Sequence, residues 1–335
     1  MPLDTIYLVR HGHRLNWTID YKTGEYFSQF PTPTGNPADP TLTSHGVRQS
    51  HELAAHVARA EFQPKPFRIY SSPFYRCLQT IQPCVEELKR SAENAADLDV
   101  RIENGLGEWF GSTTFFDHPL PSPASALQSH FPTILSVSPE TYYKPHLLPS
   151  PRGETIPELH DRAATALAAI IADIDREIQS KEAAQSASTP RTSKAILICS
   201  HAATLIAMGR ALTGRMPEDS SEEDFYVFTA GLSTFRRRQS PPIPSCDSEQ
   251  GNENALAEGT RILRPDTFVP IWRDGSGVAG GWDCVANSDC SFLSAGAERG
   301  WHFSGEESFN TGPMAPSSAT PVTAGESSTT ASLKL

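Results

Sequence analysis

Cysteine is scarce in this chain, and its spacing excludes two kinds of structure. There are six cysteines in 335 residues, with no Cys-x-x-Cys pair and no histidine cluster at the spacing of a zinc site. Disulfide frameworks belong to short, cysteine-dense secreted domains. We therefore expect reduced structural thiols in an intracellular protein that has no metal.

Long apolar runs and an excess of positive charge are also missing. No run approaches the roughly 20 residues that a membrane span requires, and the N-terminus is strand-like from Thr5 rather than signal-like. Lys and Arg number 28 against 39 Asp and Glu, a formal net charge of −11. This balance argues against a nucleic-acid surface. We expect a cytoplasmic or nuclear protein with neither a membrane nor direct nucleic acid as a partner.

The chain does contain strand-like and helix-like segments in alternation. Short apolar runs typical of buried strands alternate with segments whose apolar residues recur at helical spacing. The predicted strands cover 6–9, 67–70, 100–102, 195–199 and 225–237, and the predicted helices cover 43–60, 72–88, 123–130, 154–178 and 204–213. Ser72, followed by Pro73, is the expected N-cap of the second helix. This alternation predicts an α/β fold, a three-layer sandwich whose largely parallel central sheet is flanked by helices.

Composition divides the chain into parts. Prolines and polar residues interrupt the α/β pattern twice, aromatic residues separated by glycines follow it, and a Pro/Ser/Thr/Ala-rich stretch ends the chain. The expected organisation is one domain over 1–237 with insertions at 18–42 and 112–153, a linker over 238–259, a β-rich extension over 260–310 that packs on the domain, and a disordered tail over 311–335. The insertion at 18–42 is expected to be an ordered but irregular loop.

Basic residues follow three of the predicted strands. Arg10 and His11 end the first strand, Arg76 lies in the helix after the second, and His201 ends a third. Since the carboxyl ends of parallel strands meet at one edge of a sheet, we expect these side chains to converge there. Each residue alone could equally be a solvated strand end. Together they predict a site for a phosphoryl group, whose oxygens carry charge that several cations must balance.

The residue types fit distinct roles in phosphoryl transfer. His11 is the candidate nucleophile, and neighbouring arginines should lower the pKa of its imidazole and keep it neutral. Arg10, Arg14 and Arg76, joined by a protonated His201, are the candidate phosphate ligands. The leaving oxygen needs a proton, for which the candidate is Glu108 in a Gly-flanked loop. Glu154, which follows Gly153, is a rival for that role.

These segments resemble the motifs of a known family. Arg10-His11-Gly12, SSPFYRCLQT around Arg76, GLGEW around Glu108 and ICSHAA around His201 are similar to those of the histidine phosphatase superfamily, which has the phosphoglycerate-mutase-like fold. The resemblance covers roughly residues 4–235. It implies hydrolysis of a phosphoester through a phosphohistidine intermediate, without cofactor or metal. Asn16-Trp17 replaces the Trp-Asn pair of phosphoglycerate mutases, which argues against glycolytic mutase activity.

Within the superfamily, a fungal subgroup is more similar. The motifs above, with a later WDC and SGEE segment, resemble the phosphatase domain of the tau subunit of the RNA polymerase III transcription factor TFIIIC, more weakly through about residue 309. We favour a standalone phosphatase for phosphotyrosine or another bulky phosphomonoester, because the polar tail after 310 is too short for the further β-barrel of that subunit. The alternative is a catalytically weak scaffold subunit with TFIIIC-type protein partners.

Overall fold

A central sheet organises the computed structural model, which describes residues 2–20, 22–136, 138, 143–184, 194–238 and 251–304. The expected tail over 311–335 and most of the expected linker lie outside these residues. In strand order the sheet runs β10 (Trp282–Asp289), β8 (Leu232–Arg237), β1 (Thr5–Arg10), β7 (Ala195–Ser200), β4 (Pro66–Ser71) and β5 (Arg101–Ile102). The four strands from β1 to β5 are parallel, and β8 is antiparallel to its neighbours β1 and β10. The predicted largely parallel sheet is confirmed.

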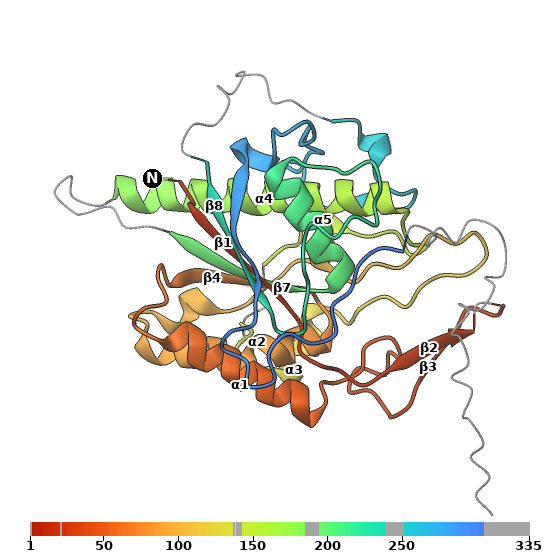
Figure 1. Cartoon of the computed structure of the whole chain (residues 1–335), viewed down its shortest axis with the longest axis horizontal. Helices are drawn as coiled ribbons and strands as arrows, with labels where there is room; N and C mark the ends of the chain where they lie inside the picture. The colour runs from red at the N-terminus through yellow and green to blue at the C-terminus, as the bar shows by residue number, and fades with distance from the viewer. Residues whose placement is uncertain are drawn as a thin grey trace, which may run out of the picture.

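Helices cover both faces of this sheet. One face carries α1 (Ser44–Ala58), α2 (Tyr75–Ser91) and α3 (Ala124–His130), and the other carries α4 (Ile156–Ala183) and α5 (Ala202–Thr213), as Figure 1 shows below and above the strands. Alternate residues of β1 serve the two layers: Ile6 and Leu8 pack in the α4–α5 core, and Tyr7 and Val9 pack in the α1–α2 core. Period-two alternation of a strand buried on both sides therefore produces the expected three layers.

The helix starts show how local sequence sets the boundaries. Helix α4 begins with a capping box, in which Glu158 accepts a hydrogen bond from the N–H of Thr155 at 2.7 Å and the Thr155 hydroxyl caps the N–H of Glu158. The predicted cap of α2 at Ser72 is wrong, because that helix starts at Tyr75 with Phe74 as its N-cap residue. The Ser72 hydroxyl is used elsewhere, 2.7 Å from Nε2 of His201.

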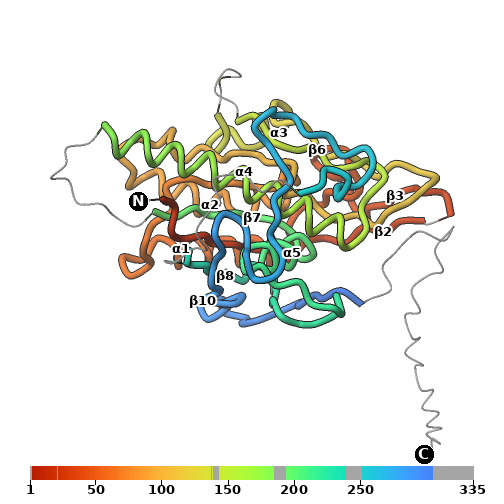
Figure 2. The backbone as a smooth tube through the Cα atoms, turned by 90° about the horizontal axis from the view of Figure 1, so that it is seen from above, coloured from red at the N-terminus to blue at the C-terminus, as the bar shows by residue number. Residues whose placement is uncertain are grey.

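The two predicted insertions contain short elements of their own. Residues 18–42 form most of the hairpin of β2 (Trp17–Asp20) and β3 (Glu25–Ser28), where only irregular loop was expected. Figure 2 shows this hairpin at the opposite end of the molecule from the start of the chain. Residues 112–153 contain α3 and the two-residue strand β6 (Leu147–Leu148). Both insertions contribute to the surroundings of the site described below.

The C-terminal segment joins the domain through strand pairing and through side-chain contacts. Strand β9 (Arg261–Ile262) pairs with β6, and β10 is the edge strand of the central sheet. Asp161 on α4 accepts hydrogen bonds from the Trp272 indole at 2.8 Å and from the guanidinium of Arg273 at 2.7 and 2.9 Å. The domain boundaries themselves stay a prediction.

The strand predicted over 225–237 is too long. Strand β8 begins only at Leu232, because the preceding residues turn away from the sheet. Ala230 adopts a left-handed backbone conformation with φ of 55°, and the carbonyl of Val227 accepts a hydrogen bond from Arg10. Within the described ranges, no helix combines the length and apolar character that crossing a membrane requires.

Candidate active site

The ends of the two central strands bring the predicted histidines together. In the parallel pair of β1 and β7, Arg10 lies opposite Ser200, so His11 and His201 leave neighbouring strands at the same level. The N–H of His11 donates to the carbonyl of Ser200 at 3.0 Å. The imidazole centroids are 5.3 Å apart. The expected convergence of distant segments at the carboxyl edge of the sheet is therefore present.

The surroundings of His11 select one tautomer and the neutral form. Its ring is 3% exposed, and Nδ1 lies 2.9 Å from the carbonyl oxygen of Gly12. A carbonyl only accepts, so Nδ1 carries the proton and Nε2 keeps a free lone pair. Burial lowers the pKa of His11 well below its ordinary value, and the charges of Arg76, His201, Arg10 and Arg14 lower it further.

His201 is held in the opposite state. Its Nε2 lies 2.7 Å from the Ser72 hydroxyl, and Nδ1 lies 3.2 Å from Oε2 of Glu108. Burial disfavours the charged imidazole, but the Cys77 sulfur at 3.6 Å and the Glu108 carboxylate outweigh it and raise the pKa of His201. A protonated ring then donates from both nitrogens, one to Ser72 and one to Glu108.

Arg76 links Glu108 to the core of the protein. Its guanidinium is fully buried and donates to Asp39 at 3.1 Å, to the carbonyl of Ala38 at 2.9 Å and to Glu108 at 3.0 Å. Burial raises the pKa of Glu108, yet the positive charges of His201 and Arg76 outweigh burial and hold it well below the usual range. Glu108 is therefore ionised in the free site.

Arg10 and Arg14 bring further positive charge to the same edge. Arg10 donates through Nη1 to the carbonyls of Val227 at 2.7 Å and Arg299 at 2.5 Å, and its buried Nε has no partner among the described residues. Arg14 lies over the ring of Trp17, 5.7 Å from its centroid. Burial lowers the pKa of each to about 10. The charge of Arg76 lowers both further and the charge of Glu108 opposes it, Glu108 being the larger of the two for Arg10 and Arg76 for Arg14.

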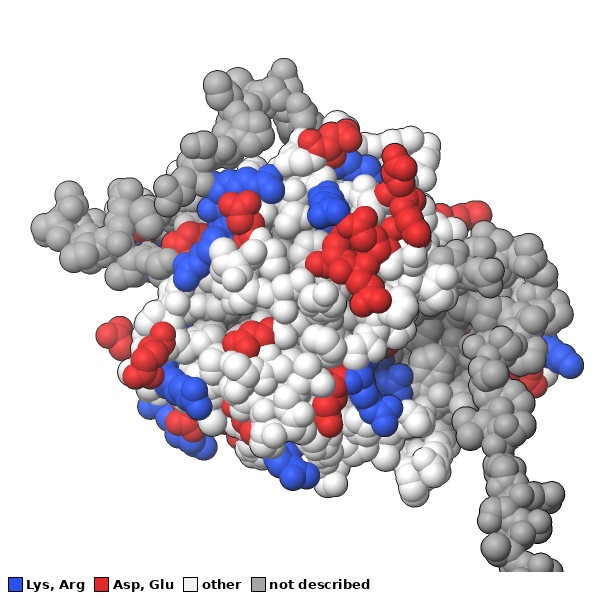
Figure 3. All heavy atoms as spheres, in the orientation of Figure 1, with Lys and Arg blue, Asp and Glu red and all other residues white. Residues whose placement is uncertain are grey.

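The outer surface contrasts with this concentration of cations. Figure 3 shows acidic side chains gathered in the upper part of the drawn face, over and beside α5. The exposed acidic residues of the loop after that helix are Glu218, Asp219, Glu222 and Glu223. The arginines at the edge of the sheet, apart from this acidic loop, favour an anionic ligand in the site.

The rival carboxylate, Glu154, is engaged elsewhere. Both of its oxygens accept from Nε of Arg162, at 2.7 and 2.9 Å, and both residues are buried. Arg162 also donates to the carbonyls of Gly105 and Gly107, in the loop that carries Glu108. Glu154 therefore supports the loop, whereas Glu108 itself contacts His201 and Arg76.

Three site residues escaped the sequence analysis. Asp39 comes from an insertion expected to be irregular, and its buried carboxylate pairs with Arg76. Ser72 was predicted only as a helix cap. Arg299 lies near residues almost 290 positions earlier in the chain, and its carbonyl contacts Arg10. The Ser72-Pro73 pair at a strand end was a usable signal for one of them, but no local pattern marks Asp39 or Arg299.

Three side chains of the site could in principle hold a metal ion. His11, Glu108 and His201 each offer one ligand atom, and these atoms lie within 4.8 Å of one another. A cation among them would be repelled by the guanidiniums of Arg10, Arg14 and Arg76, and it would need both His11 and His201 neutral. The residues fit a phosphate-sized anion better than a metal.

Fold and site together define the class of protein: a three-layer α/β domain with two histidines and a group of arginines at the carboxyl edge of its sheet. The family model of the histidine phosphatase superfamily (branch 1) matches residues 6–242. The chain belongs to this superfamily.

Three relatives are similar to parts or most of the chain. The transcription factor tau 55 kDa subunit of Saccharomyces cerevisiae is 27% identical over 310 residues, covering 90% of this chain and 59% of that protein. The ecdysteroid-phosphate phosphatase of Drosophila melanogaster is 29% identical over 122 residues, covering 31% of this chain and 15% of that protein. The crystal structure of an ecdysone phosphate phosphatase from Bombix mori with tungstate has a TM-score of 0.48 and 18% identity, covering 74% of this chain and 97% of that one. The chain thus spans less than two thirds of the first two relatives.

Proposed function

We propose that this protein hydrolyses phosphomonoesters through a phosphohistidine formed on His11. The observation that carries the proposal is the state of His11: a neutral imidazole whose Nδ1–H is bonded to Gly12 and whose Nε2 is free, among arginines. A neutral imidazole is a competent nucleophile, and fixed cations stabilise the charge on a phosphoryl group in transfer.

The first step forms the bond from Nε2 of His11 to phosphorus and breaks the ester P–O bond. The leaving oxygen takes a proton from Glu108, which has received it from the bound phosphate monoanion or from water. Binding makes this transfer feasible, because the negative phosphate beside Glu108 raises the pKa of a carboxyl that is ionised in the free site. In the second step water attacks phosphorus, the P–N bond breaks, and Glu108 accepts the water proton.

Arg14, Arg76 and protonated His201 bind the phosphoryl oxygens, and Arg10 adds its charge from the same edge. The Gly12 carbonyl stabilises the positive imidazole of the intermediate through Nδ1–H. Arg76 also connects the phosphate to the acid, since it donates to Glu108 at 3.0 Å. The pair of Arg76 and Asp39 fixes the guanidinium before substrate arrives, so little reorganisation accompanies the reaction.

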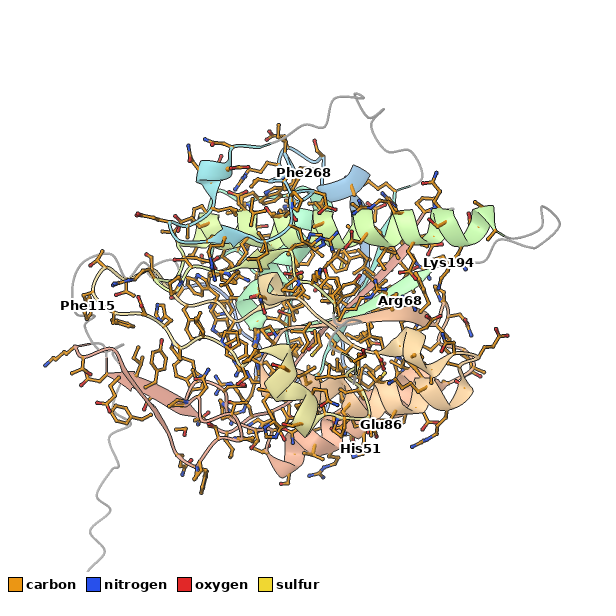
Figure 4. All side chains as sticks on the ribbon, turned by 180° about the vertical axis from the view of Figure 1, so that it is seen from behind. His51, Arg68, Glu86, Phe115, Lys194 and Phe268 are labelled. Carbon is orange, nitrogen blue, oxygen red and sulfur yellow. The ribbon has the colours of Figure 1, made fainter. Side chains whose placement is uncertain are left out.

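An aromatic wall of Trp17, Tyr26, Phe74 and Phe110 supports a bulky ester as substrate. Phe74 lies 5.0 Å from His201, and Phe110 lies 6.3 Å from both Phe74 and Trp17. The wall continues outward along the hairpin to exposed rings, including Phe115, which Figure 4 labels at this end of the molecule. Aromatic side chains contribute extra binding free energy when they pack against another aromatic ring. We therefore propose an aryl phosphomonoester such as phosphotyrosine.

The second candidate function is a scaffold, favoured by the similarity to the tau 55 kDa subunit over 90% of this chain. It would give the protein transcription-complex partners and a nuclear location. Turnover separates the two functions. The phosphatase proposal predicts hydrolysis of 4-nitrophenyl phosphate and of a phosphotyrosine peptide, with a phosphoserine peptide as the slower substrate. Absence of turnover on all three would favour the scaffold.

A further inference from the structure

We infer that Arg299, in the segment after β10, is a specificity residue that binds a second anionic group of the substrate beside the phosphoryl group. The inference rests on the proposed phosphatase function. It defines the substrate class more closely: a phosphomonoester that also carries a carboxylate or another phosphate.

Backbone contacts fix the segment against the end of β1. The carbonyl of Arg299 accepts from Nη1 of Arg10 at 2.5 Å, and the carbonyl of Glu298 accepts from the N–H of Thr229 at 3.1 Å. The N–H of Ala230 in turn donates to the carbonyl of Arg10 at 3.1 Å. Arg299 is therefore attached to the strand that ends in the proposed nucleophile.

Side-chain contacts of Glu298 hold the segment to helix α1. Its Oε2 lies 2.5 Å from Nε2 of His45 and 3.3 Å from Nε2 of Gln49. Gln49 also accepts from the N–H of His13 at 2.9 Å, so the contact reaches the residues that follow His11. Glu298 thus fixes the position of Arg299, and its carboxylate contacts His45 and Gln49 rather than the arginine.

The guanidinium of Arg299 is left without a partner. It is exposed, and it makes no hydrogen bond or ion pair with the described part of the chain. Its backbone is left-handed, with φ of 49°, a conformation that costs free energy for a residue with a side chain. An unpaired cation carried on a held backbone in such a conformation, beside other cations, indicates a function in binding an anion.

Arg299 lies at the rim rather than at the reacting atom, because it is exposed whereas His11 is buried. Its charge contributes to the lowered pKa of Arg10, Arg14 and His13, after burial. The charges that act most strongly on His11 come instead from Arg76, His201, Arg10 and Arg14. Arg299 therefore stands farther out, where it meets a group attached to the phosphoester and not the transferred phosphoryl group itself.

The experiment compares matched substrates with one and two anionic groups. The small-molecule arm uses phenyl phosphate and 4-carboxyphenyl phosphate. The peptide arm uses one phosphotyrosine peptide flanked by Asp and Glu and another flanked by Asn and Gln. For Arg299→Ala we expect the kcat/KM ratio of the doubly to the singly anionic substrate to fall about 10-fold or more, the effect of losing one charge-assisted hydrogen bond. Arg299→Lys should retain part of the ratio.

Arg261→Ala is the matched control, since this arginine is exposed on β9. It should leave the ratio at the wild-type value. If Arg299→Ala loses the preference for the doubly anionic substrate only with the peptides, the second anionic group belongs to an acidic phosphopeptide. If it loses the preference only with the phenyl phosphates, the group belongs to a small molecule. An unchanged ratio for Arg299→Ala in both arms would overturn the inference.

A binding measurement separates this inference from the proposed function. In a His11→Ala background, calorimetry gives the Kd of the acidic and neutral peptides without turnover. Loss of the preference for the acidic peptide on adding Arg299→Ala supports the inference even if the wild type hydrolyses nothing. Equal affinities for the two peptides with Arg299 present would contradict it, whatever the activity of the wild type.

Discussion

His11 and His201 face each other with their ring centroids 5.3 Å apart and their planes at 63°, and their pKa values are shifted in opposite directions. Two imidazoles at this distance are not readily charged together. Burial and arginines keep His11 neutral, whereas Glu108 and Cys77 favour the charged form of His201. The same pair therefore provides a nucleophile and a cation for the phosphate.

His11→Ala should reduce kcat by roughly 10³-fold or more, because the covalent step loses its nucleophile. The ring is buried but makes one hydrogen bond through its side chain, so we expect the free energy of unfolding to change by only about 1 kcal/mol. His51→Ala is the control, an exposed histidine on α1 that Figure 4 labels. Steady-state kinetics and urea unfolding measure both quantities. A large loss of stability with retained activity would contradict the assignment.

Arg14→Gln should raise the pKa of His11. Arg14 is one of the charges that lower it, and removing a nearby cation stabilises the imidazolium. Because Arg14 is also a proposed phosphate ligand, KM should rise about 10-fold. Nitrogen-15 NMR of the imidazole gives the pKa and the tautomer together, with Nδ1 protonated at neutral pH in the wild type. A lower pKa in the variant would show that Arg14 does not act on His11.

Glu108→Gln should mainly lower activity, whereas Glu154→Gln should mainly lower stability. Glu108→Gln removes the proposed proton donor. Hydrolysis of alkyl phosphates, whose leaving oxygen must be protonated, should therefore slow by about 10²-fold or more. Hydrolysis of 4-nitrophenyl phosphate, whose leaving group needs no proton, should slow by less. Glu154→Gln weakens the buried pair with Arg162 and should mainly lower stability, by about 3 kcal/mol. Kinetics on the two ester types and urea unfolding distinguish them. An equal effect of Glu108→Gln on both ester types would contradict the proposed role of Glu108 as the general acid.

Asp173 should link stability to pH through the contact of α4 with the segment near β9. Burial opposes ionisation of Asp173, but hydrogen bonds from His146 and Arg264 hold its pKa at about 2. A folded pKa below the unfolded one stabilises the protein above about pH 4, and this contribution is lost as pH falls towards 2. Asp173→Asn should lower the free energy of unfolding by about 2 kcal/mol at pH 7. Urea unfolding at pH 7 and pH 3 measures the difference in unfolding free energy between the wild type and Asp173→Asn. A difference that is as large at pH 3 as at pH 7 would contradict this prediction.

The parts of the fold that sequence could predict are those fixed by local pattern. The continuous apolar runs of β1 and β7 identify buried parallel strands, and the Thr155–Glu158 pair identifies the start of α4. Parallel pairing then places His11 and His201 at one edge without further information. The register of the two strands explains the result. Because Arg10 lies opposite Ser200, the next residues, His11 and His201, leave the sheet at the same level.

The rest depends on tertiary contacts that sequence patterns do not encode. Asp39 acquires its importance only through burial against Arg76, and Arg299 only through the docking of the C-terminal segment on α1. Strand β10 pairs with β8 through two register shifts, which no alternation of residues predicts. Likewise, β8 is shortened because the preceding loop turns to bond Arg10.

The most direct measurement is to trap the phosphorylated protein. Rapid-quench mass spectrometry with a phosphodonor, in parallel acid and base quenches, identifies the modified residue and its chemistry. The proposed mechanism predicts phosphate on His11 that survives base, is lost in acid and is absent from His11→Ala. Turnover without any phosphorylated protein, or with phosphate on a residue other than His11, would contradict it.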